Sequence, residues 1–337
     1  MRKVHVHACV TTLVLLFVFT LWARQRDGEG SKRSVTAVDS STVTHAKNRI
    51  VTPTETFSVG NAPRGVAFDG KYIWVANSGD NNVIKVRTTD GGIIGTFAVG
   101  LAPDGVVFDG TDIWVVNQNS NNVTKLRAAD GTNLGTFAVG HRPSTAAFDG
   151  ANLWVANTYS HSVTKLRASD GKLMGTFSVG HFPYGVTFDG ANIWVANYSD
   201  DTVTKLRASD GGHLGTFAVG VFPLASAFDG QNLWVTSHAR SDVTEIRASD
   251  GVMLGAFNVG VKPYGAAYFG NNLWVANDGG NSVTQLRISD GSVIRTFAVG
   301  FSPESFAYDG SNVWVTNNRS KSITKMSASA GDTVSNL

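Results

Sequence analysis

The sequence predicts an all-β fold, a seven-bladed β-propeller with four antiparallel strands in each blade. Every forty-residue unit holds four short β-branched and aromatic segments separated by Asp-Gly or Gly-Pro turns, and none has helical periodicity. A fixed period of this size with four strands per unit is typical of propeller blades. The period is set by seven evenly spaced tryptophans: Trp74, Trp114, Trp154, Trp194, Trp234, Trp274 and Trp314.

The second repeat illustrates the four predicted strands, at 105–108, 113–117, 123–127 and 134–140. The first two are apolar on both faces, as expected for strands sandwiched between neighbouring blades. We therefore expect the tryptophans to be structural and to pack between blades. We also expect one small first-strand residue per blade nearest the crowded axis: Ala67, Val107, Ala147, Thr187, Ala227, Ala267 and Ala307.

The third predicted strand carries a repeated Lys-x-Arg pattern, for example Lys125 and Arg127 in the second repeat. Polar faces are expected on these outer strands, and an aspartate three residues after each arginine can offset its charge. The chain has 337 residues and formal net charge +2, but residues 55–337 hold 20 basic and 23 acidic side chains. This acidic balance argues against nucleic acid as a partner.

The fourth-strand motif Phe-x-Val-Gly occurs seven times, from Phe57 to Phe297, and the first copy precedes the first tryptophan. The last repeat lacks the motif. We therefore predict that residues 55–59 form an N-terminal strand that completes the last blade beside residues 323–327. Such closure removes open sheet edges, which are the main aggregation hazard of β proteins.

Residues 1–23 are predicted to be a signal peptide or an N-terminal membrane anchor, because Arg2 and Lys3 precede an apolar run. Residues 4–23 reach the roughly 20 residues that a spanning helix needs. Residues 24–53 are polar and are predicted to form a flexible tether. Residues 54–337 are predicted to form the propeller. The expected location is therefore periplasmic, on the cell surface or secreted. The single cysteine, Cys9, lies in the leader, so no disulfide can form within the exported part.

The repeat Val-Gly-x-x-Pro-x-Gly-Val-x-Phe-Asp-Gly, followed by Trp-Val-Ala-Asn at 74–77, resembles the YVTN-type β-propeller repeats. The resemblance covers residues 55–330 and implies a seven-bladed propeller, usually exported or on the cell surface. The chain is more distantly similar to streptogramin (virginiamycin B) lyases, propellers that use magnesium, a histidine and a glutamate. The repeats contain only Glu55, Glu245 and Glu304, and none matches a lyase motif, so no lyase role is carried over.

Two turns in each blade barely change, and the other two loops vary widely. Strand alternation places both variable loops on the rim that surrounds the channel mouth, and variable loops on a rigid scaffold are typical of recognition. Exposed aromatic residues mixed with arginine often anchor interfaces. The candidate binding rim consists of Arg64, Asp104, His141, Arg142, Tyr159, His161, His181, Phe182, Tyr184, Tyr198, Phe222, His238, Arg240, Tyr264, Phe301 and Glu304.

We therefore expect a non-catalytic binding scaffold that presents this rim to a protein, a peptide or a glycan. The alternative is a lyase or hydrolase at the channel mouth, where Glu304 is the only glutamate available for acid–base chemistry. His141 and His181 occupy the same place in adjacent blades and could approach a metal with Asp104, Asp200 or His161. Solvated loop histidines are the simpler interpretation, so no metal or other cofactor is predicted.

Overall fold

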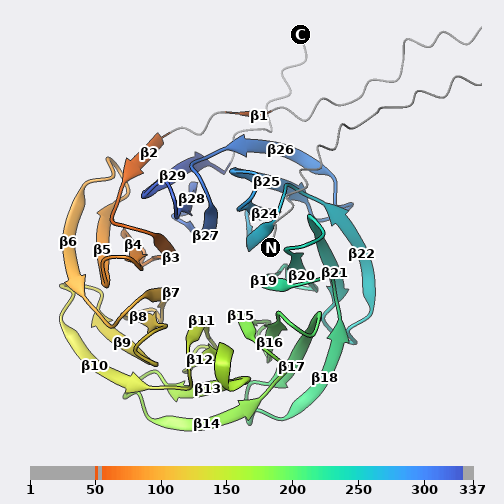
Figure 1. Cartoon of the computed structure of the whole chain (residues 1–337), viewed down its shortest axis with the longest axis horizontal. Coiled ribbons are helices and arrows are strands. Elements are labelled where there is room, and N and C mark those ends of the chain that lie inside the picture. The colour runs from red at the N-terminus through yellow and green to blue at the C-terminus, as the bar shows by residue number, and fades with distance from the viewer. Residues whose placement is uncertain (1–49, 52–54, 329–337) are drawn as a thin grey trace, which may run out of the picture. The chain divides into compact units, whose positions relative to one another are not determined.

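The computed structural model describes residues 50–51 and 55–328, whose seven antiparallel sheets surround a central channel (Figure 1). The predicted seven-bladed propeller is confirmed. The predicted leader, nearly all of the tether and residues 329–337 lie outside the described residues. In the part of the chain that the structure does describe, no helix has the length and apolarity needed to cross a membrane.

The blades are numbered 1 to 7 in chain order, and each runs outward from the channel to the outer wall of the ring. The innermost strands are β3 (Pro63–Phe68), β7 (Pro103–Phe108), β11 (Pro143–Phe148), β15 (Pro183–Phe188), β19 (Pro223–Phe228), β23 (Pro263–Phe269) and β27 (Pro303–Tyr308). The second strands are β4 (Tyr72–Asn77), β8 (Asp112–Asn117), β12 (Asn152–Asn157), β16 (Asn192–Asn197), β20 (Asn232–Ser237), β24 (Asn272–Asn277) and β28 (Asn312–Asn317).

The third strands are β5 (Asn82–Arg87), β9 (Asn122–Arg127), β13 (Ser162–Arg167), β17 (Thr202–Arg207), β21 (Asp242–Arg247), β25 (Ser282–Arg287) and β29 (Ser322–Ser327). The outer strands of blades 1 to 6 are β6 (Ile93–Ala98), β10 (Asn133–Ala138), β14 (Leu173–Ser178), β18 (His213–Ala218), β22 (Met253–Asn258) and β26 (Val293–Ala298). A 3₁₀ turn, η2 (Thr158–Ser160), follows β12, and β1 (Ile50–Val51) pairs in parallel with β26.

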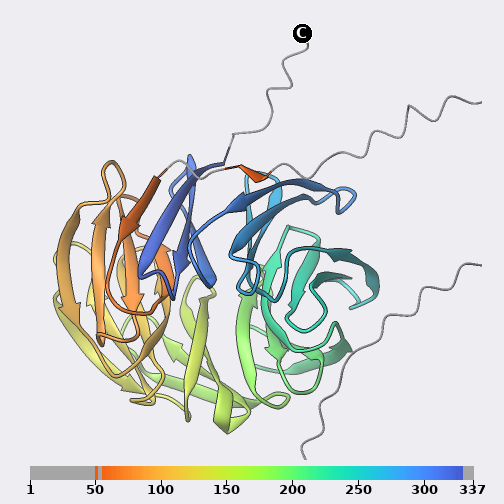
Figure 2. The same ribbon diagram turned by 45° about the horizontal axis from the view of Figure 1, so that its top comes forward.

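The outer strand of blade 7 comes from the other end of the chain. Strand β2 (Glu55–Ser58) pairs antiparallel with β29, in a register that places Glu55 opposite Lys325 and Ser58 opposite Ser322. In Figure 2 the orange-red β2 lies beside the blue strands of blade 7. Blade 7 therefore contains four antiparallel strands, as the other blades do, apart from the added β1 in the sheet of blade 6.

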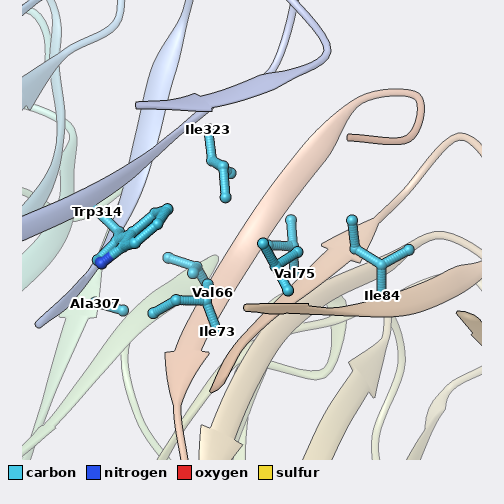
Figure 3. Packing of buried hydrophobic residues seen from close by; sticks show 8 residues of the cluster. Val66, Ile73, Val75, Ile84, Ala307, Trp314 and Ile323 are labelled. Atoms are coloured by element: carbon cyan, nitrogen blue, oxygen red, sulfur yellow. The ribbon is translucent and has the colours of Figure 1, made fainter. Parts of the chain in front are cut away.

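The core is divided into seven apolar clusters, each at the seam between neighbouring blades. Figure 3 shows the seam between blades 7 and 1, where Trp314, Ala307 and Ile323 meet Val66 and Ile73. All seven tryptophans of the repeat are fully buried at such seams. In every blade but blade 6, the indole N–H donates to the aspartate of the preceding Asp-Gly turn, as Trp154 does to Asp149 at 2.7 Å. This bond ties the buried ring to its own hairpin.

The cavity in the channel is not lined by the small residues expected nearest the axis, the series from Ala67 to Ala307. It is lined instead by the three residues that follow each rim proline, except in blade 3, where Ser144 is not part of the lining. The middle one is glycine in four blades, and a Cβ on Gly265 would lie 1.9 Å from the carbonyl oxygen of Glu304. The first strands approach so closely at the axis that most of them need glycine there.

The expected polar outer face of the third-strand lysines was also wrong. Lys165 is only 7% exposed, and its ammonium crosses the seam to the carbonyl oxygen of Ala208 at 2.7 Å. It also lies over the ring of Trp154, 4.8 Å from the centroid. A buried ammonium needs such acceptors to offset its lost hydration. The arginines behave as expected, and each pairs with its aspartate at the surface, as Arg167 does with Asp170 at 2.5 Å.

Candidate functional site

Two loops of each blade meet on the rim at the channel mouth. In blade 3, for example, the N–H of Thr158, after the second strand, donates to the carbonyl of Arg142, before the first, at 3.1 Å. The same bond joins Ser78 to Ala62 in blade 1 at 3.0 Å. The variable residues of both loops are thereby gathered into one surface around the mouth.

The rim loops are held in an unusual backbone conformation. The residue before each rim proline is left-handed although none is glycine, with φ of 47° at Arg142 and 55° at Phe222. Such residues carry strain that the surroundings must offset. At several seams a side chain of the preceding blade accepts the N–H of this residue: Asn121 bonds Arg142 at 2.8 Å and Asp201 bonds Phe222 at 2.9 Å. These bonds hold the backbone of the rim loops in this conformation.

The residue after the rim proline varies around the ring, with only tyrosine occurring twice, and these residues form the upper ring of the channel. A cavity of about 230 Å³ fills the channel below the mouth. Six residues of the ring line it: Arg64, Asp104, Tyr184, Leu224, Tyr264 and Glu304. The propeller therefore brings together side chains that are forty residues apart or more in the sequence.

A polar network crosses the channel between non-adjacent blades. The hydroxyl of Tyr184 donates to Asp104 at 3.2 Å and shares a short hydrogen bond with the hydroxyl of Tyr264. Arg64 lies 3.6 Å from the carboxylate of Asp104. The charge of Asp104 raises the pKa of Arg64, whereas burial raises the pKa of Asp104 against the lowering effect of Arg64. Burial raises the pKa of both tyrosines well above 10, so both hydroxyls are protonated at neutral pH.

Glu304 is the unpaired member of the ring. Its side chain is 8% exposed, and within the described residues no hydrogen bond or ion pair reaches its carboxyl group. Burial raises the pKa of Glu304 to about 8, and Asp104 and Asp278 add to the rise against the effects of Arg64 and Arg319. A buried carboxyl of this kind is protonated at neutral pH and is available both to donate a hydrogen bond and to transfer a proton.

Above the ring the mouth opens into a second cavity of about 560 Å³. Arg64, Tyr184, Leu224, Tyr264 and Glu304 line both cavities, so the mouth continues into the channel. The further lining residues are Gln118, Arg142, Thr158, Tyr159, Phe182, Tyr198, His238, Asp278, Ser302, Asn318 and Arg319.

Aromatic side chains make up one side of the mouth. Tyr198 stacks on Phe222 with ring centroids 4.8 Å apart, and Tyr159 meets Phe182 edge to face at 5.6 Å. The guanidinium of Arg142 lies over the Tyr159 ring and donates to Gln118 at 2.9 Å. Aromatic faces beside a few polar groups are typical of ligand sites.

The structure brings ten of the sixteen predicted rim residues to the two connected cavities. They are Arg64, Asp104, Arg142, Tyr159, Phe182, Tyr184, Tyr198, His238, Tyr264 and Glu304. Phe222 adjoins them through Tyr198. The remaining five lie on the rim outside the cavities: His141, His161, His181, Arg240 and Phe301.

Of the histidine group that the sequence suggested, the structure brings His161 and Asp200 beside His181. The rings of His161 and His181 lie with their centroids 5.0 Å apart. The Nδ1 of His181 bonds Asp200 at 2.9 Å. The Nδ1 of His161 accepts the N–H of Phe182 at 3.1 Å, so in the neutral ring the proton lies on Nε2. Throughout the described part of the chain, no three His, Cys, Asp or Glu side chains form a metal-ligating group.

Sequence reasoning missed several lining residues. Gln118, Thr158, Asp278 and Asn318 each come directly after the last residue of a second strand, at one position of the forty-residue period. That position is variable in the sequence, which is the signal that could have identified it. Tyr198 and His238 occupy the same position and were predicted, whereas the smaller polar residues of the other blades were not distinguished from ordinary loop residues.

Comparisons with known proteins support the fold alone. No family model matches the chain, and no curated protein matches it. Among solved structures it is similar to a streptogramin B lyase (TM-score 0.70, 16% identity, covering 80% of this chain and 96% of that one). It is also similar to a hydrazine synthase of Kuenenia stuttgartiensis (TM-score 0.70, 16% identity, 85% and 99%).

A third similar structure is the virginiamycin B lyase of Staphylococcus aureus, with a TM-score of 0.69 and 15% identity over 81% of this chain and 98% of that one. These similarities support the distant likeness to lyase-type propellers at the level of fold. Membership of the YVTN-type repeats stays a prediction.

Proposed function

We propose that the protein is a binding propeller that receives a segment of a protein, a peptide or a glycan at the channel mouth. The observation that carries this proposal is Glu304, a buried carboxyl without a protein partner at the junction of the two cavities. Because this carboxyl faces both cavities and bonds no side chain of the described residues, it is free to form a hydrogen bond with a ligand that enters the mouth. The aromatic side of the mouth provides the apolar contact area.

We also propose that the protein is exported and is either released or held by residues 4–23. The support for this proposal is the basic and apolar leader in the sequence. Extracellular peptides and glycans would then reach the mouth directly.

The binding proposal is tested by screening the protein on peptide and glycan arrays and measuring the affinity of each hit by calorimetry. Replacing Tyr198 by alanine removes one stacked ring from the mouth and is expected to weaken binding about tenfold or more. Phe301→Ala is the matched control, because Phe301 is 63% exposed on the same rim but lines neither cavity. Equal losses in the two variants, or none in either, would contradict a site at the mouth.

A lyase or hydrolase is the second candidate function. It is favoured by the pKa of Glu304, about 8, which suits a general acid at neutral pH, and by the fold similarity to streptogramin B lyase. The test incubates the protein with a streptogramin B and follows its loss by mass spectrometry. If the site is catalytic, Glu304→Gln abolishes turnover while binding survives. Absence of turnover in the wild-type protein would refute this activity toward streptogramins and leave the binding proposal standing.

A further inference from the structure

Five of the seven seams hold a lysine ammonium at the same place, buried in four of them and partly exposed at Lys325. The lysine lies on the third strand and donates to a main-chain carbonyl of the next blade, over a distance of 2.6 to 3.0 Å. It also lies over the tryptophan ring of its own blade. The lysines are Lys85, Lys125, Lys165, Lys205 and Lys325. A positive charge at this position is therefore a regular part of the fold.

The seam between blades 5 and 6 breaks this pattern. Glu245 stands where the lysine does in the other blades, opposite Trp234 in the sheet, and it is only 9% exposed. Its Oε1 accepts the side-chain N–H of Asn232 at 2.7 Å. Within the described residues, no hydrogen bond or ion pair reaches Oε2. Burial raises the pKa of Glu245, and the negative charge of Asp229 raises it further.

A cavity of about 520 Å³ lies beside the two carboxyl groups. Its lining includes Glu245, Asp229, Ile288, Ser289 and Asp290. Asp290 is already paired with Arg287, at 3.3 Å, and bonds the backbone of its own turn.

Ile288 and Ser289 occupy the positions whose carbonyls serve as acceptors at the other seams. Their counterparts in blade 4 are Ala208 and Ser209, whose carbonyls accept Lys165 at 2.7 and 3.1 Å. The seam between blades 5 and 6 thus retains the two main-chain carbonyls of Ile288 and Ser289. It has the carboxylate of Glu245 in place of the lysine ammonium of five other seams.

We propose that the seam between blades 5 and 6 binds a hard metal cation of the calcium class in the place that lysine ammonium groups occupy at other seams. Carboxylate and main-chain carbonyl oxygens are the ligands that such ions prefer, and water fills the rest of a flexible shell of six to eight. Glu245 and the carbonyls of Ile288 and Ser289 would supply the direct ligands. Asp229, whose carboxylate already accepts from Gln231, Asn232 and Trp234, would add negative charge beside them. The cation would link the two blades and offset the repulsion between the carboxylates.

The test measures the thermal unfolding of the full-length protein after treatment with EDTA, while calcium is titrated in and magnesium and potassium are run in parallel. The wild-type protein is expected to gain about 5 °C in Tm at a hundredfold excess of calcium over its Kd. Glu245→Gln should gain nothing. Glu245→Lys restores the residue of the other blades, so it should unfold at a higher temperature than wild type in EDTA and gain nothing from calcium.

Isothermal titration supplies the stoichiometry, which should be one calcium ion per chain in the wild type and none in Glu245→Gln. If no cation shifts the Tm of the wild type, Glu245 is a buried neutral acid and the proposal fails. It also fails if the shift persists in Glu245→Gln, because the ion would then bind elsewhere. Circular dichroism of each variant verifies folding, and Glu245→Gln alone decides the question if the lysine variant does not fold.

Discussion

At the residue scale, the channel mouth is formed by side chains that differ between blades at the same position of the repeat. The residue after the rim proline is charged in blades 1, 2 and 7, aromatic in blades 4 and 6, and small or aliphatic in the other two. The forty-residue period places all seven residues around the axis. Charged and aromatic side chains from different blades therefore lie close together. Glu304 illustrates the effect, since its pKa is raised mainly by burial and its carboxyl finds no partner among the described residues.

This raised pKa predicts a pH dependence of stability. Below pH 4.5 the carboxyl is neutral in both the folded and the unfolded chain, so it has no effect. Between pH 4.5 and about 8 the unfolded chain ionises while the folded one stays protonated, so the free energy of unfolding falls as pH rises. The loss is complete above about pH 8 and is on the order of a few kcal/mol. Glu304→Gln should therefore be more stable than wild type at pH 9, with little difference at pH 4.

Denaturant unfolding of both proteins at these two pH values checks the prediction. Glu245→Gln is a useful second comparison, because the pKa of Glu245 is also raised, but at a seam rather than in the channel. If the difference in the free energy of unfolding between wild type and Glu304→Gln is the same at both pH values, the assignment of a raised pKa to Glu304 is contradicted.

The sequence predicted these residues only in part. Tyr184, Tyr264 and Glu304 were identified because they vary at a constant position of the period, and the structure places them in one channel. The contacts themselves could not be predicted, because Tyr184 bonds Asp104 from two blades away and the period gives no distances across the ring. The buried lysines were misjudged for a related reason. A lysine on an outer strand is usually solvated, and only the neighbouring blade supplies the carbonyl that buries it.

At the element scale, almost every strand could be predicted from its own residues. The Asp-Gly turns, the β-branched runs and the tryptophans determine a hairpin register that recurs in each blade, with Trp74 opposite Lys85 in blade 1 and Trp314 opposite Lys325 in blade 7. The approach of the first strands at the axis could not be predicted, because it follows from packing seven sheets around one channel. Gly65 and Gly265 show how close the first strands are, since a side chain at either position would collide with the first strand of the next blade.

Strand β2 is the element on which the completeness of blade 7 depends. It pairs with β29, and Phe57 stacks on Trp314 with ring centroids 5.7 Å apart. We predict that deleting residues 50–60 exposes the edge of β29 and this tryptophan, lowers Tm markedly and broadens the unfolding transition. Deleting residues 24–34 serves as the control, because it shortens the predicted tether and leaves β2 intact. An unchanged Tm after the first deletion would refute the dependence of the ring on this strand.

At the scale of the whole molecule, the ring combines a nearly constant scaffold with one individual surface. Seams, turns and outer arginine–aspartate pairs repeat around the ring, with exceptions such as the glutamate at the seam between blades 5 and 6. The mouth gathers the variable side chains into a cavity of about 560 Å³ that continues into the channel. This division between scaffold and mouth explains why the sequence predicts the fold but says little about the ligand. Scaffold residues recur and are recognisable by their period, whereas the residues that define a ligand occur once each.

The central claim is that the mouth is where the protein meets its ligand. The most direct measurement places the photoreactive amino acid p-benzoylphenylalanine at Tyr198, in the mouth, or at Phe301, on the same rim outside it. After illumination of cells that express either variant, mass spectrometry identifies the adducts. A site at the mouth predicts an adduct from position 198 that is absent from position 301. An adduct that forms equally at both positions, or only at 301, would contradict the claim.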